Sequence, residues 1–446
     1  MSAPFFRPYF RRPDRPGDRL LRLAGLVERA LRAVARRLLA GRAPLRREDR
    51  DRLRPVARQR RQPEDPRALA PNARPLLYLP ALPWHERYQR PQQLAAGLAR
   101  QGRPVIYLET FDRQRLQPRW QHRVLAPGLE RVSRRLTGRP DPFRQALPPS
   151  EIEAVAEEMR RSLREPPAAV VAQLPFWLPL AVALRYAWGV PLVYDRIDLH
   201  TEFPGVPPEV GRREEELLTA ADLVTATSPD LLERSRPFAR RVEALPNGVD
   251  RSFLDFPQEP TPAVDSEGEW PVAGMVGALD QRIDTAALAR LLDSGRWRIR
   301  LAGRLEHPAM EALARSDSAG GGERLELLGE IPFDRVAPFL GSLQVGLVPY
   351  RDLAITRAID SVKVYEMLAL GLPVVVRRLP GTEHWAEVPG VHLYDDGDDL
   401  AGLLDAALAR DSNALRRQRR EAVVGASWEA RARRLGELID ELRGTA

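Results

Sequence analysis

One lysine and one glutamate, three residues apart, carry the chemistry that stands out most in this sequence. Lys363 is the only lysine among 69 basic residues, all the others being arginine. Lysine is a compact point charge that binds phosphate, whereas arginine presents a broad planar fork. Glu366 would share a helix face with Lys363, and a carboxylate can accept two hydrogen bonds from a ribose diol. The pair suits a nucleoside diphosphate, although an ordinary Lys–Glu pair on a solvated face has the same spacing.

The residues just before this pair predict the start of a helix. Asp360 or Ser361 can cap a helix expected over residues 362–370. The N-terminus of a helix offers unpaired N–H groups and the positive end of the helix dipole, both of which suit a diphosphate. We therefore expect Ser361 and Val362, at the helix start, to bind phosphate together with Lys363.

This segment resembles the donor-site signature of retaining GT-B glycosyltransferases, especially glycosyltransferase family 4. The family pattern P-x-K-h-x-E-x-h-A-x-G-x-P-V-V reads SVKVYEMLALGLPVV over residues 361–375. The resemblance implies that Glu366 binds the nucleotide ribose and that a nearby basic residue holds the diphosphate. Many members carry a further carboxylate eight residues before that glutamate, and here the position is Ala358. Asp360 is the nearest acidic substitute.

Two glycine-containing loops after predicted strands add candidates for donor binding. The loop that starts at Gly277 (GALDQRID) resembles the corresponding loop of the same family, and its glycine allows close backbone approach. Arg282 in this loop, and Arg304 directly after a Leu-Ala-Gly sequence, could meet the donor phosphates. Surface charge is the alternative for each, because the chain is rich in arginine.

A Trp- and Arg-containing stretch between the first predicted strand and its helix points to an acceptor site. Residues 83–94 (PWHERYQRPQQL) resemble a W-x-x-R-x-Q-R-P-Q-Q-L stretch of a subgroup associated with cell-envelope polysaccharides, including teichuronic-acid-type enzymes. The resemblance implies that this loop faces the interdomain cleft. Trp84 could then stack on a sugar, and Arg87 or Arg90 could bind an acceptor phosphate. The alternative is that Arg90 only braces the loop.

A second acidic segment, residues 194–200 (YDRIDLH), follows another predicted strand and resembles the Y-D-x-x-D segment of the same subgroup. Ligands bind at the carboxyl ends of parallel strands. We expect Asp195 to orient the acceptor, with a hydrogen-bonded structural role as the alternative. Asp198 and His200, together with Asp360, are the catalytic candidates.

Two parallel sheets are needed to position these residues. Short apolar runs alternate with helical stretches in two series, which is typical of crossover-connected parallel strands. The predicted strands are residues 75–80, 105–109, 168–174, 191–195, 223–226 and 242–245, and then 272–277, 298–303, 325–328, 345–349, 373–376 and 391–394. The fold class is therefore α/β, with two doubly wound Rossmann-like domains facing a cleft in the GT-B architecture, plus a basic N-terminal helical extension.

The expected domain boundaries follow from these series and from polar, proline-containing breaks. They are an N-terminal extension at 1–74, an acceptor domain at 75–248, a linker at 249–270, a donor domain at 271–425 and a C-terminal helix at 426–446 that packs back toward the first domain. Within the extension, residues 20–40 have apolar side chains at helical spacing and arginines on the other faces. Attachment to an anionic membrane surface and packing on the body are both open.

Composition excludes several classes of function. The chain has 446 residues, no cysteine and six scattered histidines, so disulfides and Cys-based metal sites are excluded and no metal is expected. No run of 18 apolar residues occurs, and the N-terminus lacks the apolar core of a secretion signal, so we expect a cytoplasmic protein with peripheral membrane contact as an option. The net charge of +8 arises from the first 70 residues, and the remainder is mildly acidic, which disfavours nucleic acid as a partner.

The resemblance and the residues together predict a glycosyltransferase that moves a sugar from a nucleotide-diphosphate donor to a glycan or lipid-linked acceptor, with retention, in cell-envelope or exopolysaccharide synthesis. No cofactor is expected beyond this co-substrate. The alternative, favoured by Ala358, is a nucleotide-sugar-binding scaffold that has lost catalysis. A dinucleotide-dependent oxidoreductase is disfavoured because no G-x-G-x-x-G opens the first helix of either domain.

Overall fold

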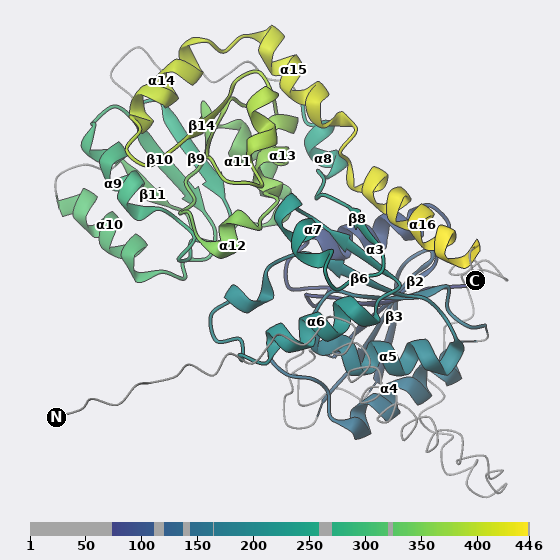
Figure 1. The fold of residues 1–446 in the computed structure, drawn as a ribbon. Helices are drawn as coiled ribbons and strands as arrows, with labels where there is room; N and C mark the ends of the chain where they lie inside the picture. The colour runs from purple at the N-terminus through teal and green to yellow at the C-terminus, as the bar shows by residue number, and fades with distance from the viewer. Residues whose placement is uncertain are drawn as a thin grey trace, which may run out of the picture.

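The computed structural model describes residues 74–110, 120–136, 143–163, 165–257, 270–319 and 324–444. The expected N-terminal helix at residues 20–40 and most of the expected linker lie outside the described residues. The described chain forms two α/β units, each built around its own sheet (Figure 1). This arrangement confirms the predicted fold class of two Rossmann-like domains.

The first sheet has eight strands in the order β3-β4-β2-β1-β5-β6-β7-β8, and every neighbouring pair is parallel except β3 with β4. Its central strands are apolar and buried along their whole length, as parallel strands covered on both faces must be. Apolar clusters fill both faces of this sheet. The strands are β1 Leu76–Leu79, β2 Val105–Glu109, β3 Trp120–Ala126, β4 Leu129–Arg134, β5 Ala169–Ala172, β6 Leu192–Arg196, β7 Leu223–Ala226 and β8 Val242–Ala244. The helices are α3 Arg90–Arg100, α4 Pro149–Ser162, α5 Leu178–Trp188, α6 Val210–Ala220 and α7 Pro229–Ser235.

The second sheet has six parallel strands in the order β11-β10-β9-β12-β13-β14. One large apolar cluster, with Trp297 fully buried in it, joins the sheet to its helices. The strands are β9 Val272–Val276, β10 Arg298–Ala302, β11 Leu325–Leu327, β12 Val345–Val348, β13 Val374–Arg377 and β14 Val391–Tyr394. The helices are α9 Thr285–Asp293, α10 Pro308–Ala319, α11 Val336–Gly341, α12 Ala354–Arg357, α13 Val362–Ala369 and α14 Leu400–Ala409.

The chain passes between the domains twice, and the two passages lie side by side. The first leads from β8 into the short helix α8 (Arg251–Leu254), and the second leads from α15 (Asn413–Val424) to α16 (Trp428–Gly444). A parallel bridge joins Val249 to Ser427. A Cβ at Gly248 would lie 2.6 Å from the carbonyl oxygen of Ala426, so the approach requires glycine here.

The last helix belongs to the core of the first domain. Figure 1 shows α16 leaving the second domain and running along the first. It packs against α3 so closely that a Cβ on Gly97 would lie 2.7 Å from the Cβ of Ala432. Trp428, Leu435 and Leu438 share one apolar cluster with Leu94 of α3. The C-terminal helix therefore covers one face of the first sheet.

The antiparallel pair β3–β4 is absent from the strands expected from sequence. Its outer strand β3 is largely exposed and carries polar residues, and a turn at Gly128 connects it to β4. A strand with so little apolar patterning resembles a loop in sequence, which explains the omission. Among the described residues, no helix is both long enough and apolar enough to cross a bilayer.

Candidate functional site

The strand order of the second sheet reverses between β9 and β12, and the strongest site candidates gather there. In open parallel sheets, ligands bind outside the carboxyl ends of the strands at this switch point. Gly277 directly follows β9, and Tyr350 lies two residues beyond the end of β12. Helix α13, which carries Lys363 and Glu366, follows the short helix α12 in the crossover from β12 to β13. The topology thus brings together segments nearly ninety residues apart.

Lys363 is held between a glycine and a tyrosine ring. Its Nζ lies 5.6 Å from the ring centroid of Tyr350, and its Cε occupies the space beside Gly277. Burial raises the pKa of the Tyr350 phenol, but the positive charges of Lys363 and Arg282, together with the polar contacts of Lys363 and Ser361, hold that pKa below its ordinary value. Lys363 forms no ion pair with any residue that the structure describes. The lysine charge is therefore left available to a ligand.

The start of α13 has unused hydrogen-bonding capacity. Ser361 occupies the N-cap position, but its side chain does not cap the helix. The residue is only 2% exposed, and apart from its contact with the Tyr350 phenol its Oγ has no hydrogen-bond partner among the described residues. Val362 packs against the apolar cluster of the first domain. The start of α13, with Lys363 two residues after Ser361, offers the hydrogen-bond donors that an anion needs.

Glu366 faces the same region without a hydrogen bond to any described residue. It is half-buried, and burial raises the pKa of its carboxyl to about 7 although Lys363 lowers that pKa and Asp250 raises it. No ion pair joins Glu366 to Lys363. An ordinary Lys–Glu pair on a solvated face, the alternative considered from sequence, does not describe this geometry, because both side chains are half-buried and unpaired.

Arg282 lies beside the lysine but is already paired. Its guanidinium forms a bidentate ion pair with Asp280, with distances of 2.6 to 3.0 Å. Burial lowers the pKa of Arg282, but the bonds to Asp280 and the charge of Asp198 raise it above its ordinary value. Arg282 is therefore held in a fixed position, and the Asp280 carboxylate already binds one edge of its guanidinium group. Arg304, in contrast, is half-exposed at the end of β10 and pairs with Glu306.

Asp198 of the first domain lies across from these cations. Its carboxylate forms no hydrogen bond within the described residues, and it lies close enough to Arg282 and Lys363 for their charges to act on it. Burial raises the pKa of Asp198, while His200, Arg282, Arg90 and Lys363 lower it, and burial is the larger effect. A carboxylate from one domain thus faces two cations from the other.

His200 lies nearby but is enclosed. It is 2% exposed, its ring packs against Phe143 and Phe203, and its Nδ1 is 3.8 Å from a carboxylate oxygen of Glu214. That nitrogen has no hydrogen-bond partner among the described residues. Glu214 itself binds Arg196, and although burial raises its pKa, His200 and Arg196 lower it to about 2. His200 is therefore enclosed by Glu214 and by aromatic neighbours that shield its ring.

Two predicted acceptor residues turn out to bind each other. Arg90 forms a bidentate ion pair with Asp195, with Nη2–Oδ1 and Nε–Oδ2 distances of 2.7 and 3.0 Å. Asp195 also accepts hydrogen bonds from Gln173 and Thr225 and is fully buried. The expectation that Arg90 and Asp195 contact the acceptor is corrected to the bracing alternative, because their polar atoms are already engaged.

Asp360 is also corrected as a catalytic candidate. It is 6% exposed, and its carboxylate accepts hydrogen bonds from the backbone N–H of Asn247 and from the hydroxyl of Tyr365. Ala358, where the family pattern has a carboxylate, is buried against Leu199, Ala226 and Leu231 of the first domain. Asp360 therefore does not take the place of the missing carboxylate.

The remaining predicted acceptor residues lie near the cleft edge. Trp84 is half-buried, its ring meets the edges of Tyr88 and Tyr107, and its backbone N–H binds Glu109. Arg87 is partly exposed, and its nearest acidic group is Glu86 at 3.7 Å. Within the described part of the chain, no three His, Asp or Glu side chains come together as a possible metal site.

Three residues of this region escaped sequence reasoning. Tyr350 could have been recognised from the sequence, because it follows the carboxyl end of a fully apolar strand, and ligands bind at the carboxyl ends of parallel strands. Asp250, which caps α8 and influences Glu366, and Asn247 appear in sequence only as parts of a turn. Their partners lie on distant segments, so no local spacing indicates their roles.

The second domain matches a known family in sequence. Residues 271–410 match the family model described as Glycosyl transferases group 1. No curated protein matches the chain in sequence.

Solved structures resemble the chain over most of its length. Sucrose-phosphate synthase from Thermosynechococcus elongatus has a TM-score of 0.63 at 17% identity, covering 84% of this chain and 100% of that one. A glycosyltransferase from Rickettsia africae has a TM-score of 0.62 at 14% identity, with coverage of 84% and 100%. Anabaena HepE, in complex with UDP and glucose, has a TM-score of 0.59 at 14% identity, with coverage of 82% and 99%.

These likenesses and the two doubly wound sheets define the GT-B fold. With the group 1 match in the second domain, the protein is a glycosyltransferase enzyme. The match to teichuronic-acid-type enzymes expected from residues 83–94 and 194–200 stays a prediction.

Proposed function

We propose that this protein transfers a sugar from a nucleotide-diphosphate donor to a glycan or lipid-linked acceptor, with retention at the anomeric carbon. The observation that carries the proposal is Lys363 at the start of α13, which forms no ion pair with any described residue, beside the buried hydroxyl of Ser361. A lysine charge, a buried hydroxyl and a helix N-terminus converge on one point, which is the chemistry that a diphosphate requires.

The half-buried carboxylate of Glu366 is the proposed ribose ligand. It lies one helical turn from Lys363, which matches the separation of a ribose from its diphosphate. Gly277 and Arg282 complete the donor side: the glycine leaves room for Lys363, and Arg282 supplies fixed positive charge. One structural relative, Anabaena HepE, has a crystal structure in complex with UDP and glucose.

The proposed mechanism relies on positioning and charge rather than on a protein nucleophile. As the glycosidic bond to the diphosphate breaks, negative charge grows on the leaving oxygen, and Lys363 with the α13 N–H groups stabilises it. The diphosphate then helps to accept the proton of the incoming hydroxyl. Asp198, facing the cations from the first domain, orients that hydroxyl. No metal is needed in this scheme, because the cationic groups neutralise the diphosphate.

On the acceptor side, we assign Trp84 and Arg87 to a glycan or a phosphorylated lipid carrier. Trp84 offers an aromatic edge at the loop after β1, and Arg87 is partly exposed beside it. A role in cell-envelope or exopolysaccharide synthesis, with residues 20–40 on the inner membrane surface, fits the basic character of that segment.

A second candidate function is a nucleotide-sugar-binding scaffold without catalysis. Ala358 favours it, because the position of the family's further carboxylate is closed by an apolar contact between the domains. Hydrolysis or transfer of the donor by purified protein separates the two functions, since a scaffold binds the donor and leaves it intact.

The test of the donor site is calorimetric titration with UDP-, GDP- and ADP-sugars. We expect one of them to bind, and Lys363→Ala and Glu366→Ala each to weaken its affinity at least tenfold. Arg315→Ala and Glu311→Ala, a mostly exposed pair on α10, are matched controls that should leave affinity unchanged. Wild-type affinity in both site variants would contradict the proposed function.

A further inference from the structure

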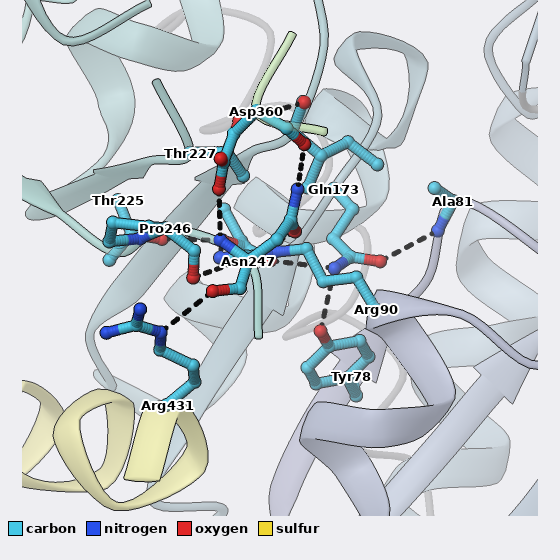
Figure 2. Close-up of polar contacts among 12 residues, drawn as sticks. Tyr78, Ala81, Arg90, Gln173, Thr225, Thr227, Pro246, Asn247, Asp360 and Arg431 are labelled. Carbon is cyan, nitrogen blue, oxygen red and sulfur yellow. Dashed lines mark hydrogen bonds and ion pairs between the residues drawn. The ribbon is translucent and has the colours of Figure 1, made fainter. Parts of the chain in front are cut away.

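Asn247 is the point at which both domains and the C-terminal helix are joined by hydrogen bonds. Its backbone N–H donates to Asp360 Oδ2 at 2.6 Å, and its side-chain Nδ2 donates to the carbonyl oxygen of Asp360 at 2.7 Å. Its side-chain Oδ1 accepts from Arg90 at 3.1 Å, and its carbonyl oxygen accepts from Arg431 of α16 at 2.9 Å. All four polar atoms of one residue are therefore engaged, each by a distant part of the chain (Figure 2).

On the first-domain side, the network is anchored in the middle of the sheet. Arg90 binds Asp195 of β6, and Asp195 accepts further bonds from Gln173 and from Thr225 of β7. Gln173 also donates to the hydroxyl of Tyr78 on β1. Figure 2 shows this chain of contacts running from Tyr78 to Asp360. Since these side chains are buried and mutually satisfied, they hold Arg90 in one position.

On the second-domain side, the network ends at the start of the donor helix. Asp360 directly precedes Ser361, the N-cap residue of α13, and it also accepts a hydrogen bond from Tyr365 one turn into that helix. A displacement of Asp360 would therefore move Ser361 and Lys363 with it. The grip of Asn247 on both the backbone and the side chain of Asp360 fixes the position and the orientation of the helix start.

Asn247 also lies where the chain passes from one domain to the other. It lies next to Gly248, where the two passages between the domains run side by side. The two bonds from Asn247 to Asp360 add a polar contact between the domains directly beside these passages. Ser228 forms another polar contact between the domains, from its hydroxyl to the carbonyl oxygen of Ala358, but it does not touch α13.

We infer that Asn247 and Asp360 are positioning residues that couple the first domain to the donor helix, setting the domain orientation and the placement of Ser361 and Lys363. The part of this inference that concerns the donor rests on the proposed function. The part that concerns domain orientation stands on the contacts alone. Neither residue touches the donor itself in this scheme.

Spin labels can report the coupling directly because the chain has no cysteine of its own. Labels at Tyr186→Cys on α5 and Arg315→Cys on α10, both exposed, place one probe in each domain. Pulsed electron resonance without nucleotide should give a narrow distance distribution in the otherwise wild-type chain. Asn247→Ala and Asp360→Ala should each broaden or shift it, because each removes one of the two hydrogen bonds that join Asn247 to Asp360.

Conservative and control variants separate positioning from general damage. Asp360→Asn keeps an oxygen that can accept from the Asn247 N–H, so it should retain the wild-type distribution. Ser228→Ala removes the other interdomain bond and should also retain it. An unchanged distribution in both alanine variants, or equal broadening in Ser228→Ala, would overturn the inference. If Asn247→Ala does not fold, Asp360→Ala, which leaves the Arg90–Asn247 bond in place, carries the test.

Titration with UDP and with GDP completes the experiment. If wild type binds either nucleotide, Asn247→Ala and Asp360→Ala should weaken it about tenfold, and Asp360→Asn should restore most of the affinity. Failure of wild type to bind any nucleotide would contradict the proposed donor site, while the label distances would still decide the coupling. Wild-type nucleotide affinity in both alanine variants would overturn the positioning of α13.

Discussion

The side chain of Lys363 occupies the space that a β-carbon at Gly277 would fill. An ideal Cβ at that glycine would lie 2.2 Å from Lys363 Cε and 2.8 Å from Nζ. Gly277 also has a positive φ of 153°, which side-chain-bearing residues rarely adopt. A β-carbon at residue 277 would therefore strain the backbone and push the end of the Lys363 side chain out of its present position.

Replacing Gly277 with alanine should displace Lys363 and weaken nucleoside diphosphate binding. We expect a loss of about tenfold in affinity, or about 1.4 kcal/mol, together with a loss of about 1–3 kcal/mol in the free energy of unfolding. Titration calorimetry and thermal unfolding measure the two effects. Gly397→Ala is the matched control, because Gly397 has a positive φ of 89° but a Cβ there would have no atom within 4 Å. Equal effects on affinity in both variants would refute the steric explanation.

Nucleotide affinity should rise with pH through about 7 because of Glu366. Burial raises the pKa of this carboxyl to about 7, so it is largely protonated at pH 6 and largely ionised at pH 8. The ionised form accepts both hydrogen bonds from a ribose diol, and the protonated form has lost part of that capacity. Calorimetry at pH 6 and pH 8 should show the rise in wild type. Glu366→Gln should bind more weakly at pH 8 and lack this pH dependence, and an identical slope in the variant would assign the titration elsewhere.

Asp360→Asn should become more stable relative to wild type as the pH rises. Burial raises the pKa of Asp360 from 3.8 to about 6, although the Asn247 N–H, Tyr365, Arg90 and Arg431 all lower it. A folded-state pKa above the unfolded value favours the fold at low pH, and this contribution is lost as the pH rises through 6. The difference of about two units corresponds to about 3 kcal/mol. Unfolding free energies at pH 4 and pH 8 should therefore diverge in favour of the asparagine variant, and parallel curves would disprove the assignment.

Restoring the family carboxylate by Ala358→Glu should damage the protein rather than improve it. Ala358 is 1% exposed, among Leu199, Ala226 and Leu231 of the first domain. An uncompensated charge at such a site costs about 3–5 kcal/mol. The variant should therefore unfold at a lower temperature or lose this apolar contact between the domains. Ala414→Glu, on the exposed side of α15, is the control and should unfold like wild type. A stable Ala358→Glu variant with stronger donor binding would show that the position still belongs to the donor site.

The sequence predicts this fold well because parallel strands buried on both faces are continuous apolar runs. The β1, β5 and β12 segments can be recognised in this way. Strand β3 cannot, because it is exposed and polar. Lys363 and Glu366 are found because their spacing, helix start and family pattern are all local features. The structure adds that they are unpaired, which spacing cannot show.

The residues whose internal partners the sequence did not reveal share one property, which is that the partner lies far away in the chain. Arg90 and Asp195 are 105 positions apart, and Asn247 and Asp360 are 113 apart. Each has the side chain of a ligand-binding residue in sequence, and only the fold reveals that another side chain or backbone group already satisfies it. Polar residues at a cleft can be read as ligand contacts only after such internal partners have been excluded.

The packing of α16 on α3 has a consequence for synthesis on the ribosome. The part of one face of the first sheet that α3 leaves open stays uncovered until residues 428–439, near the end of the chain, have emerged. The N-terminal half therefore cannot finish folding before the second domain has been translated, and premature termination anywhere in that domain would release a chain with this apolar face exposed to chaperones and proteases.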